Sequence, residues 1–305
     1  MPIDNVFSKK FLTIKNSFLT SREEKQIYIV ALLQKQKGTI MKFVFIGSGK
    51  MGTALASALV NSKMAPVDDV TAVDPLDKAR DAFTKTTGIK CVPDAAGVAP
   101  QADVLILAVK PQIAEKVVTS LPKLPKNPLV ISICAGIPIR KLSAWFGSSR
   151  IIRVMPNTPL MVGKGASAFA LGAAATDADA KIAGDLLSKS GFAAQVNEEQ
   201  LDAVTGLSGS GPAYVFELAK ALSMAGENVG LSPELSLALS LQTIAGAAEM
   251  LSQKIGSPDE LRDAVTSPNG TTYAGLMVMQ KRQFRDMIKE TVEAATKRSE
   301  ELGKA

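Results

Sequence analysis

The chain has 305 residues, of which 46% are hydrophobic, so it can form one or two domains with sizeable cores. No uninterrupted apolar run reaches the ~18 residues that a membrane-spanning helix needs, so we expect no membrane partner. Residues 1–40 carry seven basic and three acidic side chains, or +4 of the net charge of +6, and the nearly neutral remainder does not suggest a nucleic-acid partner.

Residues 1–40 look foreign to the domain that follows them. The expected first strand starts at Met41–Phe43, and Met41 is itself a plausible initiator. Residues 7–13 are basic and acid-poor, as transit peptides are, and residues 21–33 have the apolar spacing of a short amphipathic helix. We expect the extension to be dispensable or a targeting segment, and a chain that begins at Met41 to fold and function normally.

The first expected strand, Phe43–Ile46, leads into three glycines with the spacing G-x-G-x-x-G and then into a helix over 53–60. In such a turn Gly47 permits the tight bend, Gly49 lets the backbone approach a pyrophosphate and Gly52 lets the helix pack closely on the strand. The anion would sit on the unpaired amides at the positive end of the helix dipole. A plain turn is the alternative, but the flanks favour a dinucleotide site formed by Gly47, Ser48, Gly49, Lys50, Met51 and Gly52.

Four more apolar runs, each ending in a turn-forming or small residue, predict the rest of a sheet. They are 70–73 ending at Asp74, 103–109 ending at Lys110–Pro111, 129–134 ending at Ala135–Gly136, and 150–155 ending at Pro156–Pro159. Strands that alternate with helices predict an α/β fold with a doubly wound (Rossmann), mostly parallel sheet. Ligands of such sheets bind outside the carboxyl ends of the strands, so we expect the five strand ends to form the cofactor wall.

Asp74 is the candidate for selecting the cofactor. It lies 22 residues after Gly52, where dinucleotide folds carry an acidic residue that hydrogen-bonds the adenosine ribose. Asp74–Pro75 also fits an ordinary turn at the end of a strand, and this alternative stays open. An acidic residue here repels a 2′-phosphate and favours NADH, whereas Lys78 and Arg80 close behind it rescue NADPH if the next helix turns them inward.

After the fifth strand the alternation of strands and helices fades. Residues 166–171 and 193–196 predict two further strands around a helix near 177–190, and the remainder predicts helices only. We therefore expect a dinucleotide-binding domain over 41–198 and an all-helical domain over 199–305.

Three Ser–Pro pairs mark expected helix starts, because serine is a favoured N-cap and proline a favoured first helical residue. They are Ser232–Pro233, Ser257–Pro258 and Ser267–Pro268. The helix near 233–253 is apolar over most of its circumference, which indicates burial on several sides. A subunit interface and a central position within a monomer explain this surface equally well.

Two glycine- and hydroxyl-rich segments of the helical half go beyond simple packing. They are Asp202–Tyr214 and Leu261–Thr272. Each predicts a turn that leads into a helix and exposes backbone amides beside Ser or Thr hydroxyls, which is a good seat for a carboxylate. Simple helix capping is the alternative for both.

Together with the glycine turn, five segments resemble the pyrroline-5-carboxylate reductase family: Ala108–Pro111, Cys134–Gly136, Met155–Pro159, Ser208–Tyr214 and Ser267–Thr272. The match keeps the order of the family from Lys42 to about Leu302, so it covers everything except the extension. The resemblance implies reduction of the ring imine of 1-pyrroline-5-carboxylate to L-proline, the last step of proline biosynthesis. Since the family accepts both NADPH and NADH, commonly with NADPH preferred, we expect this chain to use both. The resemblance also implies a homodimer that interlocks through the helical domain, and dimers of this family often assemble into rings.

The resemblance assigns a role to each matching residue. The implied cofactor residues beyond the glycine turn and Asp74 are Ala108, Val109, Lys110 and Pro111 along the cofactor, Ala135 and Gly136 beside the nicotinamide, and Met155 and Asn157 nearby. The implied substrate residues are Ser267, Asn269, Gly270, Thr271 and Thr272. Gly270 and Thr271 offer backbone amides to the carboxylate, and the hydroxyl of Thr272, the catalytic residue, hydrogen-bonds the ring nitrogen.

One departure from the family concerns Asn269–Gly270, where two glycines are usual. If position 269 needs a positive φ, asparagine is the least costly replacement for glycine, so we expect the turn to survive.

The chain contains no histidine, which excludes a histidine-based acid and a Ser–His relay. Its two cysteines, Cys91 and Cys134, lie far apart in expected Rossmann segments, so we expect no metal site and reduced core thiols, as in a cytoplasmic protein. Hydride transfer to an imine fits a chain without histidine or a metal site, because the cofactor supplies the reducing equivalent and the protein mainly positions the reactants. Thr272 accepts a hydrogen bond from a protonated imine, and Thr272 or a water donates one to a neutral imine; the sequence does not decide between these.

Two other classes share part of the pattern. A hydroxyacid or phosphogluconate-type dehydrogenase places a catalytic lysine near a G-x-x-G-x-G turn, but here Gly206–Gly211 is followed by Pro212, and the next lysine is Lys220. A catalytically inactive dinucleotide-binding scaffold or regulator is the second alternative, and the intact turn at Thr272 argues against it.

Overall fold

The computed structural model describes residues 41–304, so the expectations about the extension, residues 1–40, lie outside the described residues. The strands are β1 Phe43–Ile46, β2 Val70–Val73, β3 Lys90–Val92, β4 Val104–Leu107, β5 Leu129–Ser132, β6 Ile151–Met155, β7 Gly165–Leu171 and β8 Gly191–Gln195. The helices among the strands are α3 Lys50–Asn61, α4 Asp77–Thr87, α5 Pro111–Thr119, α6 Ile139–Phe146 and α7 Asp177–Ser188, with short turns η1 Val67–Asp69, η2 Ala99–Gln101 and η3 Thr158–Val162. The helical half contains η4 Glu198–Gln200, α8 Leu201–Val204, the π-helical turn η5 Thr205–Gly209, α9 Gly211–Asn228, α10 Pro233–Ser252, α11 Pro258–Ala264, α12 Thr271–Lys281 and α13 Phe284–Lys304.

The strands form one mostly parallel sheet in the order β3-β2-β1-β4-β5-β6-β7-β8. β1 to β6 are parallel, β7 runs antiparallel to β6, and β8 is parallel to β7. The order reverses between β1 and β4, which is the switch point of a doubly wound sheet. The expected fold class is confirmed, and so are the two further strands and the helix between them. The sequence prediction missed β3, because three residues are too few to show a period.

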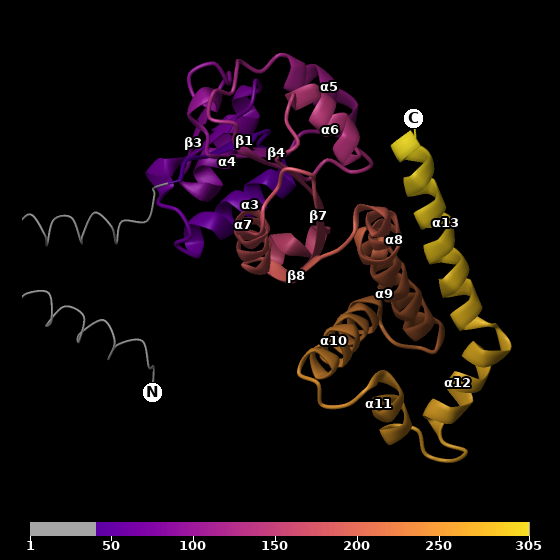
Figure 1. Cartoon of the computed structure of the whole chain (residues 1–305). Coiled ribbons are helices and arrows are strands. Elements are labelled where there is room, and N and C mark those ends of the chain that lie inside the picture. Colours follow the sequence, from indigo (N-terminus) through magenta and orange to yellow (C-terminus); the bar gives the residue numbers. More distant parts are fainter. Residues whose placement is uncertain (1–40, 305) are drawn as a thin grey trace, which may run out of the picture. The chain divides into compact units, whose positions relative to one another are not determined.

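Helices cover both faces of this sheet. α3 contacts α4 and α7, whereas α5 contacts α6, and the two groups lie on different faces (Figure 1). β1, β4 and β5 are buried along their whole length, as strands covered on both faces should be. This double cover explains why their sequences read as unbroken apolar runs.

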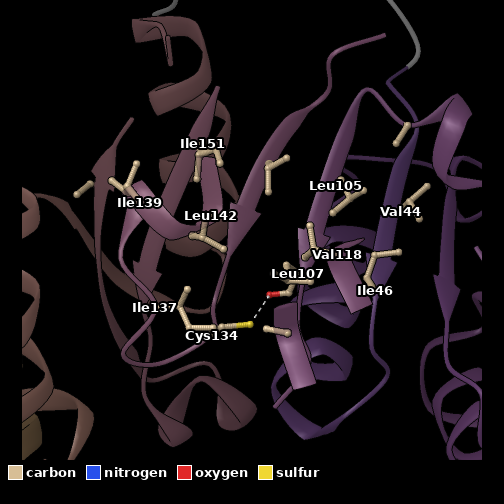
Figure 2. Close-up of a cluster of buried hydrophobic side chains, with 14 of the residues drawn as sticks. Val44, Ile46, Leu105, Leu107, Val118, Cys134, Ile137, Ile139, Leu142 and Ile151 are labelled. Atoms are coloured by element: carbon tan, nitrogen blue, oxygen red, sulfur yellow. Dashed lines mark hydrogen bonds between the residues drawn. The ribbon is translucent and has the colours of Figure 1, made fainter. Parts of the chain in front are cut away.

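Figure 2 shows the cluster of buried side chains that α5 and α6 press onto the sheet. Val118 of α5 and Leu142 of α6 pack with Leu105 and Leu107 of β4. Cys134 belongs to this cluster, and its Sγ donates to the Leu107 carbonyl oxygen at 3.7 Å. Burial raises the pKa of the Cys134 thiol, so this thiol stays protonated in the core as expected.

Two of the three expected Ser–Pro helix starts are confirmed. The Ser232 hydroxyl accepts from the Leu235 amide at 3.3 Å, and the Ser257 hydroxyl accepts from the Glu260 amide at 3.3 Å. The third prediction is wrong, because α12 begins at Thr271 rather than beside Ser267–Pro268. Asn269 adopts φ +57°, which no helix residue can have, so the helix starts only after it.

Small residues line the contact between α9 and α10, while the large apolar side chains face outward. Ser223, Ser236 and Ser240 are buried, and a Cβ on Gly226 would lie 2.7 Å from the Ser236 hydroxyl oxygen. The outward side chains, each at least 47% exposed, are Phe216, Met224, Leu235, Leu237, Leu239 and Leu241. α10 is therefore not a central helix of the single chain, so a central position within a monomer does not explain its apolar surface.

α10 has the length and mean hydropathy of a membrane span, but Glu234, Glu249 and other polar residues interrupt its apolar residues, so the observation that no apolar run reaches ~18 residues stands. It is 20 residues long and contains an 18-residue window with a mean hydropathy of 1.2, and only 11% of that window is buried. Among residues 41–304 it is the one helix that passes this test of length and composition. The test alone is weak, because helices that pack in soluble proteins pass it too.

An ion pair joins the sheet to α7. Asp179, which is 1% exposed, accepts two bonds from the Arg150 guanidinium, Nε at 3.1 Å and Nη2 at 2.7 Å, and it also closes a capping box with Thr176. Burial favours the neutral acid, but the hydrogen bonds from Arg150 and Thr176 outweigh it and lower the pKa of Asp179. Because the folded pKa is lowered, the stabilisation is present above the unfolded pKa of about 3.9 and is lost as the pH falls through the folded value.

We expect Asp179→Asn to lower the free energy of unfolding by about 2–3 kcal/mol at neutral pH, the contribution of hydrogen bonds to a charged group. The control is Asp185→Asn on the same helix, whose exposed pair with Lys181 contributes about 0.5 kcal/mol. Urea unfolding of both variants at neutral and acidic pH measures the difference. Equal losses in the two variants, or a gap between wild type and Asp179→Asn that widens in acid, would contradict this account.

Candidate functional site

The glycine turn between β1 and α3 has the tight geometry that its spacing predicts. Gly47 adopts φ +101°, and its amide donates to the Val73 carbonyl oxygen at 2.8 Å. A Cβ on Gly47 would lie 2.6 Å from the Ala108 carbonyl oxygen, and a Cβ on Gly52 would lie 2.9 Å from the Gly47 carbonyl oxygen. The close packing of β1, α3 and the end of β4 therefore requires the first and third glycines.

Gly49, by contrast, faces open space. Beyond its chain neighbours, no atom lies within 4 Å of a Cβ built at this position. Gly49 is the N-cap of α3, which has no side-chain cap and no acidic residue in its first turn. The first amides of α3 therefore lack partners within the helix and add to the positive end of its dipole. This open cradle fits a pyrophosphate.

Asp74 follows β2 and binds the glycine turn directly. Its Oδ2 accepts from the Ser48 amide at 3.1 Å and from the Ser48 hydroxyl at 2.9 Å. Its Oδ1 accepts from the Leu76 amide at 3.0 Å, which is the turn that the alternative interpretation describes. Arg80 donates to the Asp74 carbonyl oxygen at 3.0 Å and pairs with Asp77. Asp74 thus holds the glycine turn in place at the end where an adenosine ribose would lie.

Cys91 of β3 lies at this end of the site and is half-buried, so its expected place in the core is wrong. Burial, and after it the Asp74 carboxylate, raise the pKa of the Cys91 thiol to about 11. The thiol is therefore protonated at neutral pH and is a poor nucleophile. Within residues 41–304, no group of three or more Cys, Asp or Glu side chains is arranged to hold a metal ion.

Five strand ends lie in a row along one edge of the sheet. The registers align Ile46 of β1 with Val73 of β2 and Leu107 of β4, and Leu107 with Ser132 of β5, and β6 continues the row. Pro111 starts α5 directly after β4, with Lys110 as its N-cap. The predicted cofactor residues at this edge are Ala108, Val109, Lys110 and Pro111 after β4, Ala135 and Gly136 after β5, and Met155 and Asn157 at the end of β6.

The last helix of the chain reaches the Ala135–Gly136 turn. Gly136 adopts φ +72°, and a Cβ there would lie 3.6 Å from the Cβ of Leu302 in α13. Arg140, near the start of α6, donates to the Gly303 carbonyl oxygen at 3.4 Å. α13 therefore contacts the strand-end edge although it belongs to the helical half.

Asn157 uses both polar atoms of its side chain within the protein. Its Nδ2 donates to the Ser208 carbonyl oxygen at 3.1 Å, and its Oδ1 accepts from the Ala166 amide at 2.8 Å. The buried side chain thereby links the end of β6 to the helical half and does not project into solvent.

The Asp202–Tyr214 segment corrects a further expectation, because it is helical except for a bend at Ser210 rather than an open turn. It contains α8, the π-helical turn η5 and the start of α9. A Cβ on Gly206 would lie 2.8 Å from the Val292 carbonyl oxygen of α13, and one on Gly209 would overlap the side chain of Met155. Gly206 and Gly209 therefore allow close packing at the joint between β6 and α13, rather than forming an open turn. Such π-helical turns are rare and occur frequently at functional sites.

The predicted substrate turn, Ser267–Thr272, precedes α12. The Gly270 amide donates to the Ser267 carbonyl oxygen at 3.0 Å, and Asn269 adopts φ +57°. Proline at the second position and a positive φ at the third are typical of a type II turn, so the expectation for Asn269 is confirmed. The Gly270 amide is engaged in the turn, which differs from its expected role toward a carboxylate. Thr271 and Thr272 start the helix, and their amides lack helical partners.

The structure brings the cofactor candidates together but leaves the substrate turn apart from them. The extensive contacts of α12 are with α13 alone, not with a strand of the sheet (Figure 1). Within a single chain, the predicted substrate residues therefore lie apart from the strand ends. They are Ser267, Asn269, Gly270, Thr271 and Thr272.

Comparisons with known proteins cover most of the chain. A family model described as pyrroline-5-carboxylate reductase dimerisation matches residues 198–302, and one described as NADP oxidoreductase, coenzyme F420-dependent, matches residues 42–136. The pyrroline-5-carboxylate reductase of Arabidopsis thaliana is 44% identical over 87% of this chain and 96% of its own length. A crystal structure of the Plasmodium falciparum pyrroline carboxylate reductase with NADP bound is 34% identical, with a TM-score of 0.76, and covers 86% of this chain and 98% of that one. The Coxiella burnetii reductase structure has a TM-score of 0.80 at 31% identity, covering 88% and 100%.

The doubly wound sheet and its open glycine turn define a Rossmann-type dinucleotide-binding oxidoreductase with a helical second part. Relatives more than 30% identical over most of both chains narrow this class further. The chain belongs to the pyrroline-5-carboxylate reductase family.

Proposed function

We propose that this chain reduces the ring imine of 1-pyrroline-5-carboxylate to L-proline with NADPH or NADH, as a step of proline biosynthesis. The observation that carries the proposal is the turn Ser267–Thr272, in which Asn269 adopts φ +57° and the Gly270 amide donates to the Ser267 carbonyl oxygen. An inactive scaffold would have no need of such a turn. The open cradle at Gly49 and the relatives named pyrroline-5-carboxylate reductase support the same function.

The chain provides the cofactor wall along the carboxyl ends of five strands. The amides of Gly49–Gly52 bind the pyrophosphate, and Ser48 with Asp74 forms the adenosine end. The residues assigned to the rest of the wall are Ala108, Val109, Lys110, Pro111, Ala135, Gly136, Met155 and Asn157, the last through support of the β6 end. When bound, NADPH or NADH supplies the hydride, and these residues fix where it is delivered.

The substrate is held by the turn before α12. The amides of Thr271 and Thr272, together with the positive end of the α12 dipole, bind the carboxylate, and Ser267 and Asn269 fix the turn. The hydroxyl of Thr272, the catalytic residue, hydrogen-bonds the ring nitrogen as the imine becomes an amine. No histidine is needed for this chemistry, since positioning does most of the work.

A second copy of the chain brings a substrate turn next to the cofactor wall, which a single chain does not do. The outward apolar side chains of α9 and α10 form a surface that a homodimer would cover. In this dimer the Thr272 turn of one protomer faces the strand-end edge of its partner, and dimers can assemble further into rings. We assign residues 41–198 to dinucleotide binding and 199–305 to substrate binding and dimerisation, in a cytoplasmic protein without nucleic-acid or membrane partners.

The proposed reaction is tested by following NADPH and NADH oxidation with 1-pyrroline-5-carboxylate, beside a small panel of 2-hydroxy acids with the oxidised cofactors. Turnover of the imine alone is the expected result. Turnover of a hydroxy acid alone would move the chain to the dehydrogenase class, and dinucleotide binding without any turnover would favour a scaffold.

We expect Asp74→Ser to shift the ratio of kcat/KM values toward NADPH, because removing the carboxylate removes its repulsion of a 2′-phosphate. The variant also loses the bonds from Ser48 and Leu76, so its thermal stability is measured alongside to separate a loosened turn from changed selectivity. Steady-state kinetics with both cofactors gives the ratio. A ratio equal to that of the wild type would remove Asp74 from the cofactor site.

A further inference from the structure

A buried guanidinium occupies the middle of β6, two residues before Met155. Arg153 is 7% exposed, which is unusual for arginine and requires partners. Its Nη1 donates to Glu198 Oε1 at 3.1 Å, and its Nη2 lies 3.7 Å from Asp202 Oδ1. Arg153 thus ties the central sheet to the segment where the helical half begins.

Each of the two carboxylates holds one further element. Glu198 Oε1 accepts from the Ile139 amide at 2.7 Å, which fixes the first residue of α6. Asp202 Oδ1 accepts from the Ser299 hydroxyl at 2.6 Å, which fixes the last turns of α13. One guanidinium therefore links the start of α6 to the end of α13 through a carboxylate on each side.

Both elements adjoin the Ala135–Gly136 turn. α6 begins three residues after Gly136, and the Cβ of Leu302 in α13 would lie 3.6 Å from a Cβ on Gly136. Arg140 of α6 closes the ring by donating to the Gly303 carbonyl oxygen. The turn that faces the nicotinamide in the proposed function thus adjoins two elements that share Arg153.

We infer that Arg153 is a positioning residue for the Ala135–Gly136 turn, acting through Glu198 and Asp202, and that it sets the place of the nicotinamide ring. The inference rests on the proposed function for the identity of the turn. The planar guanidinium can bridge two carboxylates in fixed directions, which a lysine cannot do equally well. A displacement of about 1 Å at a reacting centre can cost roughly 10²-fold in rate, so a rigid support for this turn has a large kinetic effect.

The test compares Arg153→Met, Arg153→Lys, Glu198→Gln and Ser299→Ala with the matched control Thr291→Ala. Thr291 lies on α13 as Ser299 does, but its hydroxyl bonds only the Met287 carbonyl oxygen of its own helix. We expect kcat for imine reduction to fall about 10- to 100-fold in Arg153→Met and roughly 10-fold in Ser299→Ala. The kcat of Arg153→Lys and of Glu198→Gln should lie between the values of these two variants and that of the wild type. The kcat of Thr291→Ala should equal that of the wild type.

A binding measurement separates positioning from general damage. ADP-ribose probes the glycine turn without a nicotinamide, so its Kd should be unchanged in every variant, while the extra affinity of NADH over ADP-ribose should shrink in Arg153→Met and Ser299→Ala. Equal weakening of both ligands, or unchanged kcat in Ser299→Ala and Glu198→Gln, would overturn the inference. Should Arg153→Met fail to fold, the Ser299 and Glu198 variants decide. If the wild type binds NADH but reduces no imine, the proposed function fails, and the affinity difference still tests the role of Arg153.

Discussion

Replacing Thr272 with valine is expected to lower kcat/KM for imine reduction by about 10- to 10³-fold, the cost of one polar contact made in the transition state. Valine keeps the shape of threonine and removes only the hydroxyl. Thr272 is the second residue of α12, after the turn in which Asn269 takes a positive φ. The affinity for the cofactor should hardly change, because the turn belongs to the helical half. Steady-state kinetics with 1-pyrroline-5-carboxylate measures the effect.

The neighbouring Thr271→Val is the matched control. Only the backbone amide of Thr271 is assigned a role, so its valine variant should cost much less than that of Thr272. A crippled Thr271→Val beside a near-normal Thr272→Val would place the catalytic hydroxyl one residue earlier. Normal turnover of both variants would reduce this turn to a helix cap.

Gly49→Ala is expected to raise the Kd for NADPH and NADH by about 10- to 100-fold while leaving the stability of the protein unchanged. A Cβ at Gly49 meets no protein atom within 4 Å, and its φ of −65° suits alanine, so the fold has no reason to change. The methyl group would instead fill the cradle proposed for the pyrophosphate. Overpacking of this kind costs about 1–3 kcal/mol, and each 1.4 kcal/mol is tenfold in affinity.

Two other glycine variants serve as controls for Gly49→Ala. Gly97→Ala, also in open space but away from the strand-end edge, should change neither affinity nor stability. Gly47→Ala should lower both, because its Cβ would meet the Ala108 carbonyl oxygen and its φ is +101°. Calorimetric titration and thermal melting of the three variants give the comparison. An unchanged Kd in Gly49→Ala would show that the pyrophosphate does not lie there.

The centre of the sheet could be predicted because β1, β4 and β5 are covered on both faces. Unbroken apolar runs such as Phe43–Ile46 leave little choice of structure, and the glycines that follow fix the strand-to-helix turn. Asn269 adopts a positive φ, which asparagine tolerates better than most residues with a Cβ, so the turn survives as expected. These features depend on neighbours within a few residues, which a sequence displays directly.

Other features depend on partners that are distant in the chain. Gly206 and Gly209 resemble turn glycines, yet the contacts with α13 and Met155 make them packing residues of a π-helical turn. Ser267–Pro268 has the composition of a helix start, but the turn that contains Asn269 delays the helix. No local pattern reports such tertiary contacts.

The ionic network around Arg153 was also missed, although the sequence carries a signal for it. Arg153 interrupts the otherwise apolar run Ile151–Met155, and a charge inside a buried strand needs a partner. The sequence does not say that this partner is Glu198, 45 residues later. The separation of Thr272 from the strand ends was equally invisible, because it arises from the length and packing of α9 to α13.

The transfer of deuterium from labelled NADPH to the product tests the central claim most directly. NADPH that carries deuterium at both C4 positions is incubated with the protein and 1-pyrroline-5-carboxylate, and the product is analysed by mass spectrometry and NMR. We predict one L-proline for each NADPH consumed, with one deuterium on carbon 5 of proline, which was the imine carbon. Oxidation of NADPH without labelled proline, or no oxidation at all, would contradict the assignment of this chain as an imine reductase.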